Sequence, residues 1–86
     1  MPFAVEYRKS AERELNALET QIRLRVDDCL ERIALDPYAR GTAKLQGGDE
    51  RRVRVGDYRV LYEVDVPNRR IIVIAIRHRR EVYRGR

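Results

Sequence analysis

The sequence is poor in several residue types that stabilise or equip small domains. Its 86 residues include one cysteine, Cys29, one histidine, His78, and no tryptophan. A single cysteine excludes an internal disulfide, and one histidine beside one cysteine provides no set of ligands with the spacing of a zinc site. We therefore expect no disulfide, no bound metal and no cofactor.

Long hydrophobic runs are also absent. The longest apolar run, residues 71–76, is far shorter than the roughly 18–20 residues of a membrane-spanning helix, and no signal peptide is recognisable. Hydrophobic residues still make up 43% of the chain and recur with clear periods, which argues against disorder although 38% of the residues are charged. We expect one domain, residues 1–86, with a modest core, in a soluble cytoplasmic protein that binds no membrane.

Lysine is scarce, because only Lys9 and Lys44 among the 19 basic residues are lysines. Residues 1–43 contain seven basic and eight acidic residues, a net charge of −1, whereas residues 44–86 contain twelve and six, a net charge of +6. Such segregated positive charge favours a polyanionic partner, since arginine clusters attract phosphates and displace their counterions. A solvated surface, or a genome composition rich in arginine codons, explains the same pattern, so composition alone leaves both interpretations open.

The first half of the chain predicts one strand and two helices. Apolar residues alternate over residues 3–7, which is the period of a strand with one buried face. Ser10 can act as the N-cap of a short amphipathic helix. After a break near Glu19–Thr20, residues 22–33 carry an apolar stripe that predicts a longer helix, and Pro37 ends it because proline disfavours helical geometry at the preceding residue.

The second half predicts a sheet. Residues 37–50 have the composition of a surface loop, which Leu45 pins to the core. Beyond this loop, alternation over residues 52–55 and 58–64, with Gly-Asp between them, predicts a β-hairpin. The β-branched run 71–76 suits a central strand that is covered on both faces.

The order of these elements predicts the fold class. Strand, helix, helix, strand, strand, strand (β-α-α-β-β-β) is typical of an α+β domain in which a helical hairpin packs on one face of a small, mainly antiparallel sheet. The other face is then open. Because Arg52 and Arg54 alternate with Val53 and Val55, strand geometry places both guanidinium groups on this open face or at its edge.

Motifs in the second half resemble those of the RelE/ParE toxin superfamily. They are the string RVRVGDYRVLY at residues 52–62, the string HRREVY at residues 78–83, and an L-x-G loop at residues 45–47. The resemblance covers nearly the whole chain, including the order of its elements. It implies a RelE-like fold and a toxin that is neutralised by a cognate antitoxin, with which it forms a hetero-oligomer. RelE-like members are ribosome-dependent endonucleases that cut messenger RNA, whereas ParE-like members inhibit DNA gyrase.

The same resemblance implies catalytic residues. Arg59 aligns with the phosphate-binding arginine of the G-x-Y-R motif, Arg79 with the second arginine and Tyr83 with the terminal tyrosine of the family. Arg77 and Arg80 are alternatives for the role of Arg79, because this chain is shorter here than some RelE members. Both are also RNA-binding candidates. The competing interpretation gives these residues ordinary structural roles. Arg59 is then a strand arginine paired with a carboxylate, while Arg79 and Tyr83 belong to a solvated tail or, for the tyrosine, pack as a core aromatic.

Arg52 and Arg54 complete the predicted catalytic set, at places where RelE members often carry basic residues for proton transfer and phosphate contact. Arginine binds phosphoryl oxygens well but is a poor base, so the identity of the general base stays open. Lys44, in the loop, and His78, in the basic tail, are further RNA-binding candidates or ordinary exposed side chains. The leading hypothesis is a ribosome-dependent mRNA endonuclease; the alternatives are a gyrase inhibitor and a non-catalytic RNA-binding member of the family.

Overall fold

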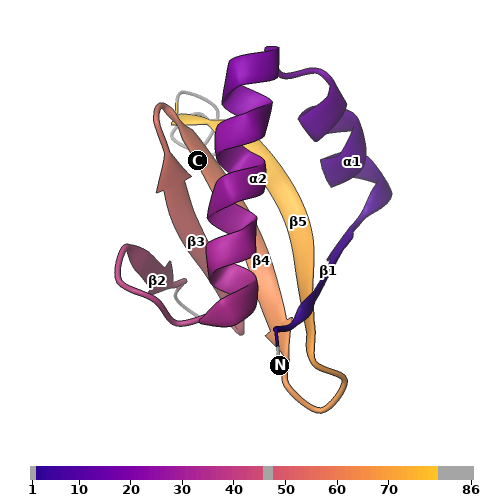
Figure 1. Cartoon of the computed structure of the whole chain (residues 1–86), viewed down its shortest axis with the longest axis vertical. Helices are drawn as coiled ribbons and strands as arrows, with labels where there is room; N and C mark the ends of the chain where they lie inside the picture. Colours follow the sequence, from indigo (N-terminus) through magenta and orange to yellow (C-terminus); the bar gives the residue numbers. More distant parts are fainter. Residues whose placement is uncertain (1, 46–47, 80–86) are drawn as a thin grey trace.

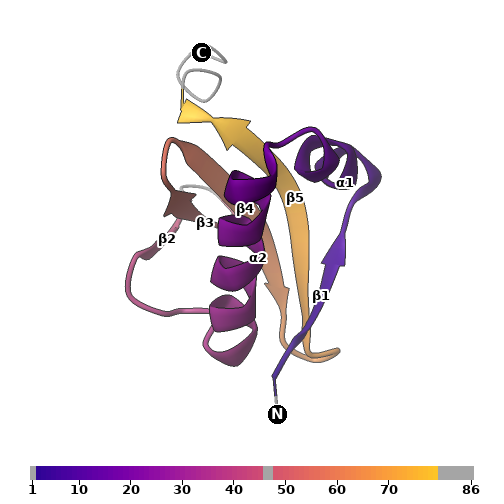
Figure 2. The same cartoon turned by 45° about the horizontal axis from the view of Figure 1, so that its top comes forward.

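The computed structural model describes residues 2–45 and 48–79. The two helices lie on one side of a sheet, and its other side carries no helix in this described part of the chain (Figures 1 and 2). The α+β architecture is therefore confirmed. In chain order the elements are β1 (Ala4–Tyr7), α1 (Lys9–Asn16), α2 (Thr20–Leu35), β2 (Thr42–Lys44), β3 (Glu50–Val55), β4 (Tyr58–Asp65) and β5 (Arg70–His78).

The strands form one sheet in the order β1-β5-β4-β3-β2. β1 runs parallel to β5, and the other three pairs are antiparallel, so the sheet is mainly antiparallel as predicted. The pairing of β4 with β5 contains a β-bulge, because Leu61 pairs with Ala75 while the next residue, Tyr62, pairs with Val73. Ile74 is therefore an extra residue in β5.

The core lies between α2 and the helix-bearing face of the sheet. The amphipathic stripe of α2 is buried as the sequence predicted, and Asp36 terminates this helix directly before Pro37. α1 adds Ala11, which is fully buried. Apolar side chains at alternating sheet positions form the other half of the core, namely Val53, Val55, Val60, Tyr62, Ile71, Val73 and Ile76.

Three local predictions are wrong. Residues 37–50 include a short strand, β2, because Thr42–Lys44 pair with β3. Ser10 is not an N-cap: the extended residue before α1 is Arg8, and its side chain makes no capping hydrogen bond. The run 71–76 is not covered on both faces, since Ile72 and Ile74 are only half-buried on the face without a helix. That uncovered face, called the open face below, carries the arginines.

Candidate nucleic-acid interface

Three arginines from three strands occupy neighbouring positions on the open face. Arg54 of β3 pairs with Arg59 of β4, which pairs in turn with Arg77 of β5. Directly opposed side chains in antiparallel strands have Cβ atoms about 4.5–5.5 Å apart. We call these residues the arginine row. Arg54 and Arg77 are exposed, whereas Arg59 between them is 6% exposed.

The arginine row concentrates positive charge on one part of the open face. The register places three arginines in succession on neighbouring strands, and like charges in such positions repel one another unless other groups compensate them. Arg52 lies on the same face one pair further along β3, opposite Leu61, and extends the positive surface.

The β-bulge in β5 brings Arg77 into this row. Val73 faces the helices, so uninterrupted alternation would also turn Arg77 toward them. The extra residue Ile74 shifts the phase by one, which buries Ile76 and places Arg77 on the open face beside Arg59. Bulges commonly re-aim a side chain next to a functional site.

Arg77 is anchored by a carboxylate from α1. Its Nε lies 3.0 Å from Oε2 of Glu14, and Oε1 of Glu14 accepts a hydrogen bond of 2.8 Å from the backbone N–H of Ile76. β1 pairs with β5 only as far as Val73, and α1 packs beside β5 (Figure 1). The signal in the sequence was weak: Glu14 is one acidic residue among several in the first helix, and its contacts depend on how that helix docks.

Arg54 also borders a groove between α2 and β3. The groove has a volume of about 620 Å³ and is lined by Arg25, Asp28, Cys29, Glu31, Arg32, Leu35, Arg54 and Val55. Arg54 makes no hydrogen bond or ion pair with another described residue. The groove wall contains both signs of charge, and burial raises the pKa of the Cys29 thiol. Arg54 therefore connects the open face with a groove wall of mixed charge at the edge of β3.

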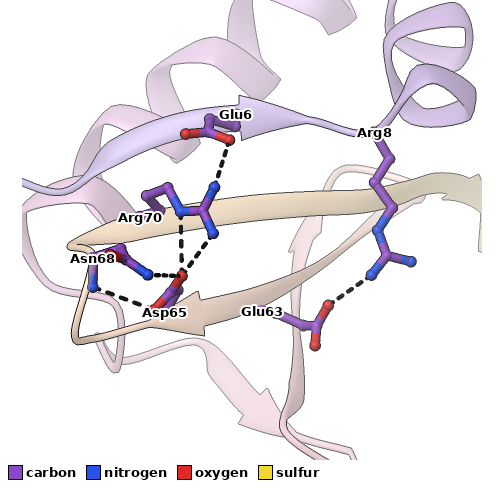
Figure 3. A network of polar contacts seen from close by, with 6 residues as sticks. All are labelled: Glu6, Arg8, Glu63, Asp65, Asn68 and Arg70. Carbon is purple, nitrogen blue, oxygen red and sulfur yellow. Dashed lines mark hydrogen bonds and ion pairs between the residues drawn. The ribbon is translucent and has the colours of Figure 1, made fainter.

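The opposite end of the open face is neutralised by a polar network (Figure 3). Arg70 binds Asp65 at 2.8 Å and Glu6 at 3.1 Å, and the side chain of Asn68 donates to Asp65 at 3.0 Å. The hydrogen bonds from Arg70, followed by those from Asn68, lower the pKa of Asp65. In the same view a second pair joins Arg8 to Glu63, at 3.0 Å.

Arg79 and His78 do not join the arginine row. Arg79 follows the end of β5; its backbone N–H donates to the carbonyl of Asp57 at 2.8 Å, and its guanidinium lies 4.0 Å from the Asp57 carboxylate. His78 pairs with Tyr58, and their rings meet edge to face with centroids 5.2 Å apart. This places His78 on the helix-bearing side of the sheet.

The remaining predicted residues lie elsewhere. Lys44 ends the edge strand β2 and pairs with Arg51, which the register places on the helix-bearing face. Arg80 and Tyr83 lie outside the described residues, so their roles stay predictions. Within residues 2–45 and 48–79, no group of three or more His, Cys, Asp or Glu side chains could hold a metal ion. No helix in this part of the chain is long and apolar enough to cross a membrane.

Comparison with known proteins decides the family. Residues 5–83 match the family described as the ParE toxin of type II toxin-antitoxin systems, parDE. The chain belongs to this toxin family. The resemblance to the RelE/ParE superfamily is thereby confirmed, although no curated protein matches the toxin.

Solved RelE structures share the fold of this toxin. The archaeal RelE–RelB complex from Pyrococcus horikoshii is 27% identical with a TM-score of 0.82, covering 92% of the toxin and 97% of that chain. Isolated Escherichia coli RelE is 23% identical with a TM-score of 0.81, covering 96% and 93%. The RelBE2 toxin–antitoxin complex from Mycobacterium tuberculosis is 23% identical with a TM-score of 0.81, covering 91% and 99%.

Proposed function

We propose that this toxin is a RelE-like, ribosome-dependent mRNA endonuclease that inhibits translation. The arginine row carries the proposal. When a 2′-OH attacks the adjacent phosphate, extra negative charge develops on the phosphoryl oxygens, and planar guanidinium groups bind two such oxygens at once. Arg54 and Arg77 are exposed on either side of Arg59, so the row offers adjacent cations on a face that neither α1 nor α2 covers.

Within this proposal Arg77, rather than Arg79, is the second phosphate-binding arginine. Arg77 is the direct cross-strand neighbour of Arg59. Arg79 instead follows the end of β5 and contacts Asp57. Arg52 contributes further positive charge along the path of the RNA. Tyr83 keeps its predicted part in base stacking or proton exchange.

The composition of the row also supports dependence on the ribosome. A guanidinium group has five N–H donors and no acceptor, so Arg54, Arg59 and Arg77 stabilise charge but do not remove the 2′ proton. Cleavage then relies on alignment of the attacking oxygen with the scissile bond, which a partner that holds the message in line can supply. We propose the programmed ribosome as that partner, and the cytoplasm as the place of action.

A cognate antitoxin is the second proposed partner. The relatives from Pyrococcus horikoshii and Mycobacterium tuberculosis were solved as toxin–antitoxin complexes. A basic open face attracts an acidic chain that folds as it binds. Co-purification of this toxin with the small protein encoded beside it, followed by loss of toxicity on co-expression, would test the pairing.

The test of the nuclease proposal is cleavage on programmed ribosomes, with the 5′ ends mapped by primer extension. Arg54→Ala and Arg77→Ala each remove one charge-assisted contact of about 1.5–3 kcal/mol, so cleavage should fall roughly 10- to 100-fold. Arg70→Ala is the matched control, because Arg70 lies on the same face but within the polar network. Intact message at saturating wild-type toxin would refute the proposal, and inhibition of gyrase supercoiling by the same preparation would establish the ParE-like alternative.

A further inference from the structure

Glu14 uses its two carboxylate oxygens on two consecutive residues of β5. Oε1 accepts the backbone N–H of Ile76 at 2.8 Å, and Oε2 pairs with Nε of Arg77 at 3.0 Å. The side chains of Glu14 and Arg77 are 30% and 45% exposed, so neither is lost in the core. The carboxylate therefore fixes both the strand backbone and the side chain that follows it.

We propose that Glu14 is a positioning residue for phosphate binding by Arg77. The inference rests on the proposed nuclease function. The pairing of β1 with β5 ends at Val73, so β1 provides no carbonyl for the backbone N–H of Ile76. The carboxylate of Glu14 accepts this hydrogen bond instead. α1 thus fixes the segment that follows the β-bulge, where the alternation of side chains between the two faces of β5 has shifted by one residue.

The orientation of the guanidinium suits this role. Arginine has five N–H donors, and the ion pair with Glu14 engages Nε. The two terminal nitrogens of Arg77 make no hydrogen bond with another described residue and can bind a phosphate in a bidentate manner. A side chain that is already held loses less rotamer freedom on binding. The negative charge of Glu14 also reduces the repulsion between Arg77 and Arg59.

The competing role for Glu14 is that of general base. Oε1 already accepts a hydrogen bond and Oε2 is ion-paired with Arg77, so removal of a 2′ proton would require one of these contacts to break. The two roles predict different pH profiles. Loss of a base removes a titrating limb from the profile, whereas loss of a positioning contact lowers the rate by the same factor at every pH.

The experiment is a double-mutant cycle of Glu14→Gln and Arg77→Ala, measured as single-turnover mRNA cleavage on programmed ribosomes at saturating toxin. We expect Glu14→Gln to lower the rate roughly 10- to 100-fold in the wild-type background and to have no further effect beside Arg77→Ala. Glu12→Gln is the control, because Glu12 makes the same charge change on the exposed side of α1. The Arg77 Nε–Hε NMR signal should shift in Glu14→Gln and stay in place in Glu12→Gln.

Each result decides between specific ideas. If wild type cleaves and Glu14→Gln cleaves equally well, the positioning role is wrong and the nuclease function stands. A full effect of Glu14→Gln in the Arg77→Ala background, or loss of a pH limb, also overturns the positioning role. If wild type leaves the message intact, the nuclease function falls and the inference falls with it, while an unmoved Arg77 signal would show that the ion pair itself is absent in solution.

Discussion

The hydroxyl of Tyr62 offers a clean test of how the loop after α2 is held. Tyr62 is fully buried in β4, and its hydroxyl donates a hydrogen bond of 2.8 Å to the carbonyl of Pro37. Burial raises the pKa of this phenol, so it stays a neutral donor. The bond joins the sheet to the start of the segment that leads into β2, which the sequence pattern alone did not predict to be structured.

Tyr62→Phe removes the donor and keeps the ring. The Pro37 carbonyl is then buried without a partner, which costs about 1–3 kcal/mol. In a domain of this size each kcal/mol lowers Tm by roughly 4–8 °C, so the expected loss is of the order of 5–20 °C. Urea unfolding should show a lower midpoint with an unchanged slope, because the surface exposed on unfolding stays the same.

Tyr58→Phe is the matched control. Tyr58 is half-buried on the same strand, and its hydroxyl makes no hydrogen bond with a described residue. This variant should change the free energy of unfolding by less than about 0.5 kcal/mol. Equal effects of the two substitutions would refute the reasoning, since they would show that the ring environment, and not the bond to Pro37, determines the loss.

Three further predictions concern stability. Ile33→Ala, at 2% exposure in α2, should cost about 2–5 kcal/mol in urea unfolding, whereas Leu35→Ala, at 73% exposure, should cost almost nothing. Gly56→Ala should cost at least about 1–2 kcal/mol, because the residue has a φ of +59° and its new Cβ would lie 3.3 Å from the guanidinium of Arg25. Hydrogen bonds lower the pKa of Asp65 in the folded protein from its usual value of 3.8. The ionised carboxylate therefore stabilises the fold above pH 3.8, and this stabilisation is lost as the pH falls through the lower pKa of the folded state. Asp65→Asn should flatten the acid side of a plot of Tm against pH.

Local pattern was sufficient for much of the fold. The alternation in β1, β3 and β4 and the apolar stripe of α2 each report a buried face, and the structure places those faces as predicted. β2 escaped prediction because three residues are too few to show a period. Thr42–Lys44 become a strand only by pairing with β3, and Leu45 continues the connection through its N–H to the carbonyl of Glu50.

The candidate site was predictable in part, because strand alternation fixes only residues on one uninterrupted strand. It correctly grouped Arg52 with Arg54 on the open face. Arg77 was harder to place in the arginine row, because the face of the sheet on which it lies depends on the bulge at Ile74. An unbroken apolar run shows no alternation from which such a bulge could be predicted. Glu14 depends on tertiary docking across 62 positions of sequence and carried no signal of its own.

The composition of the second half was compatible with either a polyanion-binding surface or ordinary solvated charge. The open face now gives a reason to favour the first. At one end Arg70 is neutralised by Asp65 and Glu6, which is how solvated charge is normally arranged on a sheet. At the other end Arg54, Arg59 and Arg77 stand in direct cross-strand succession, and the bulge that completes the row interrupts regular pairing to do so. Arginines aligned across three strands are the arrangement that a phosphate-binding surface requires, because clustered guanidinium groups attract a polyanion and displace its counterions.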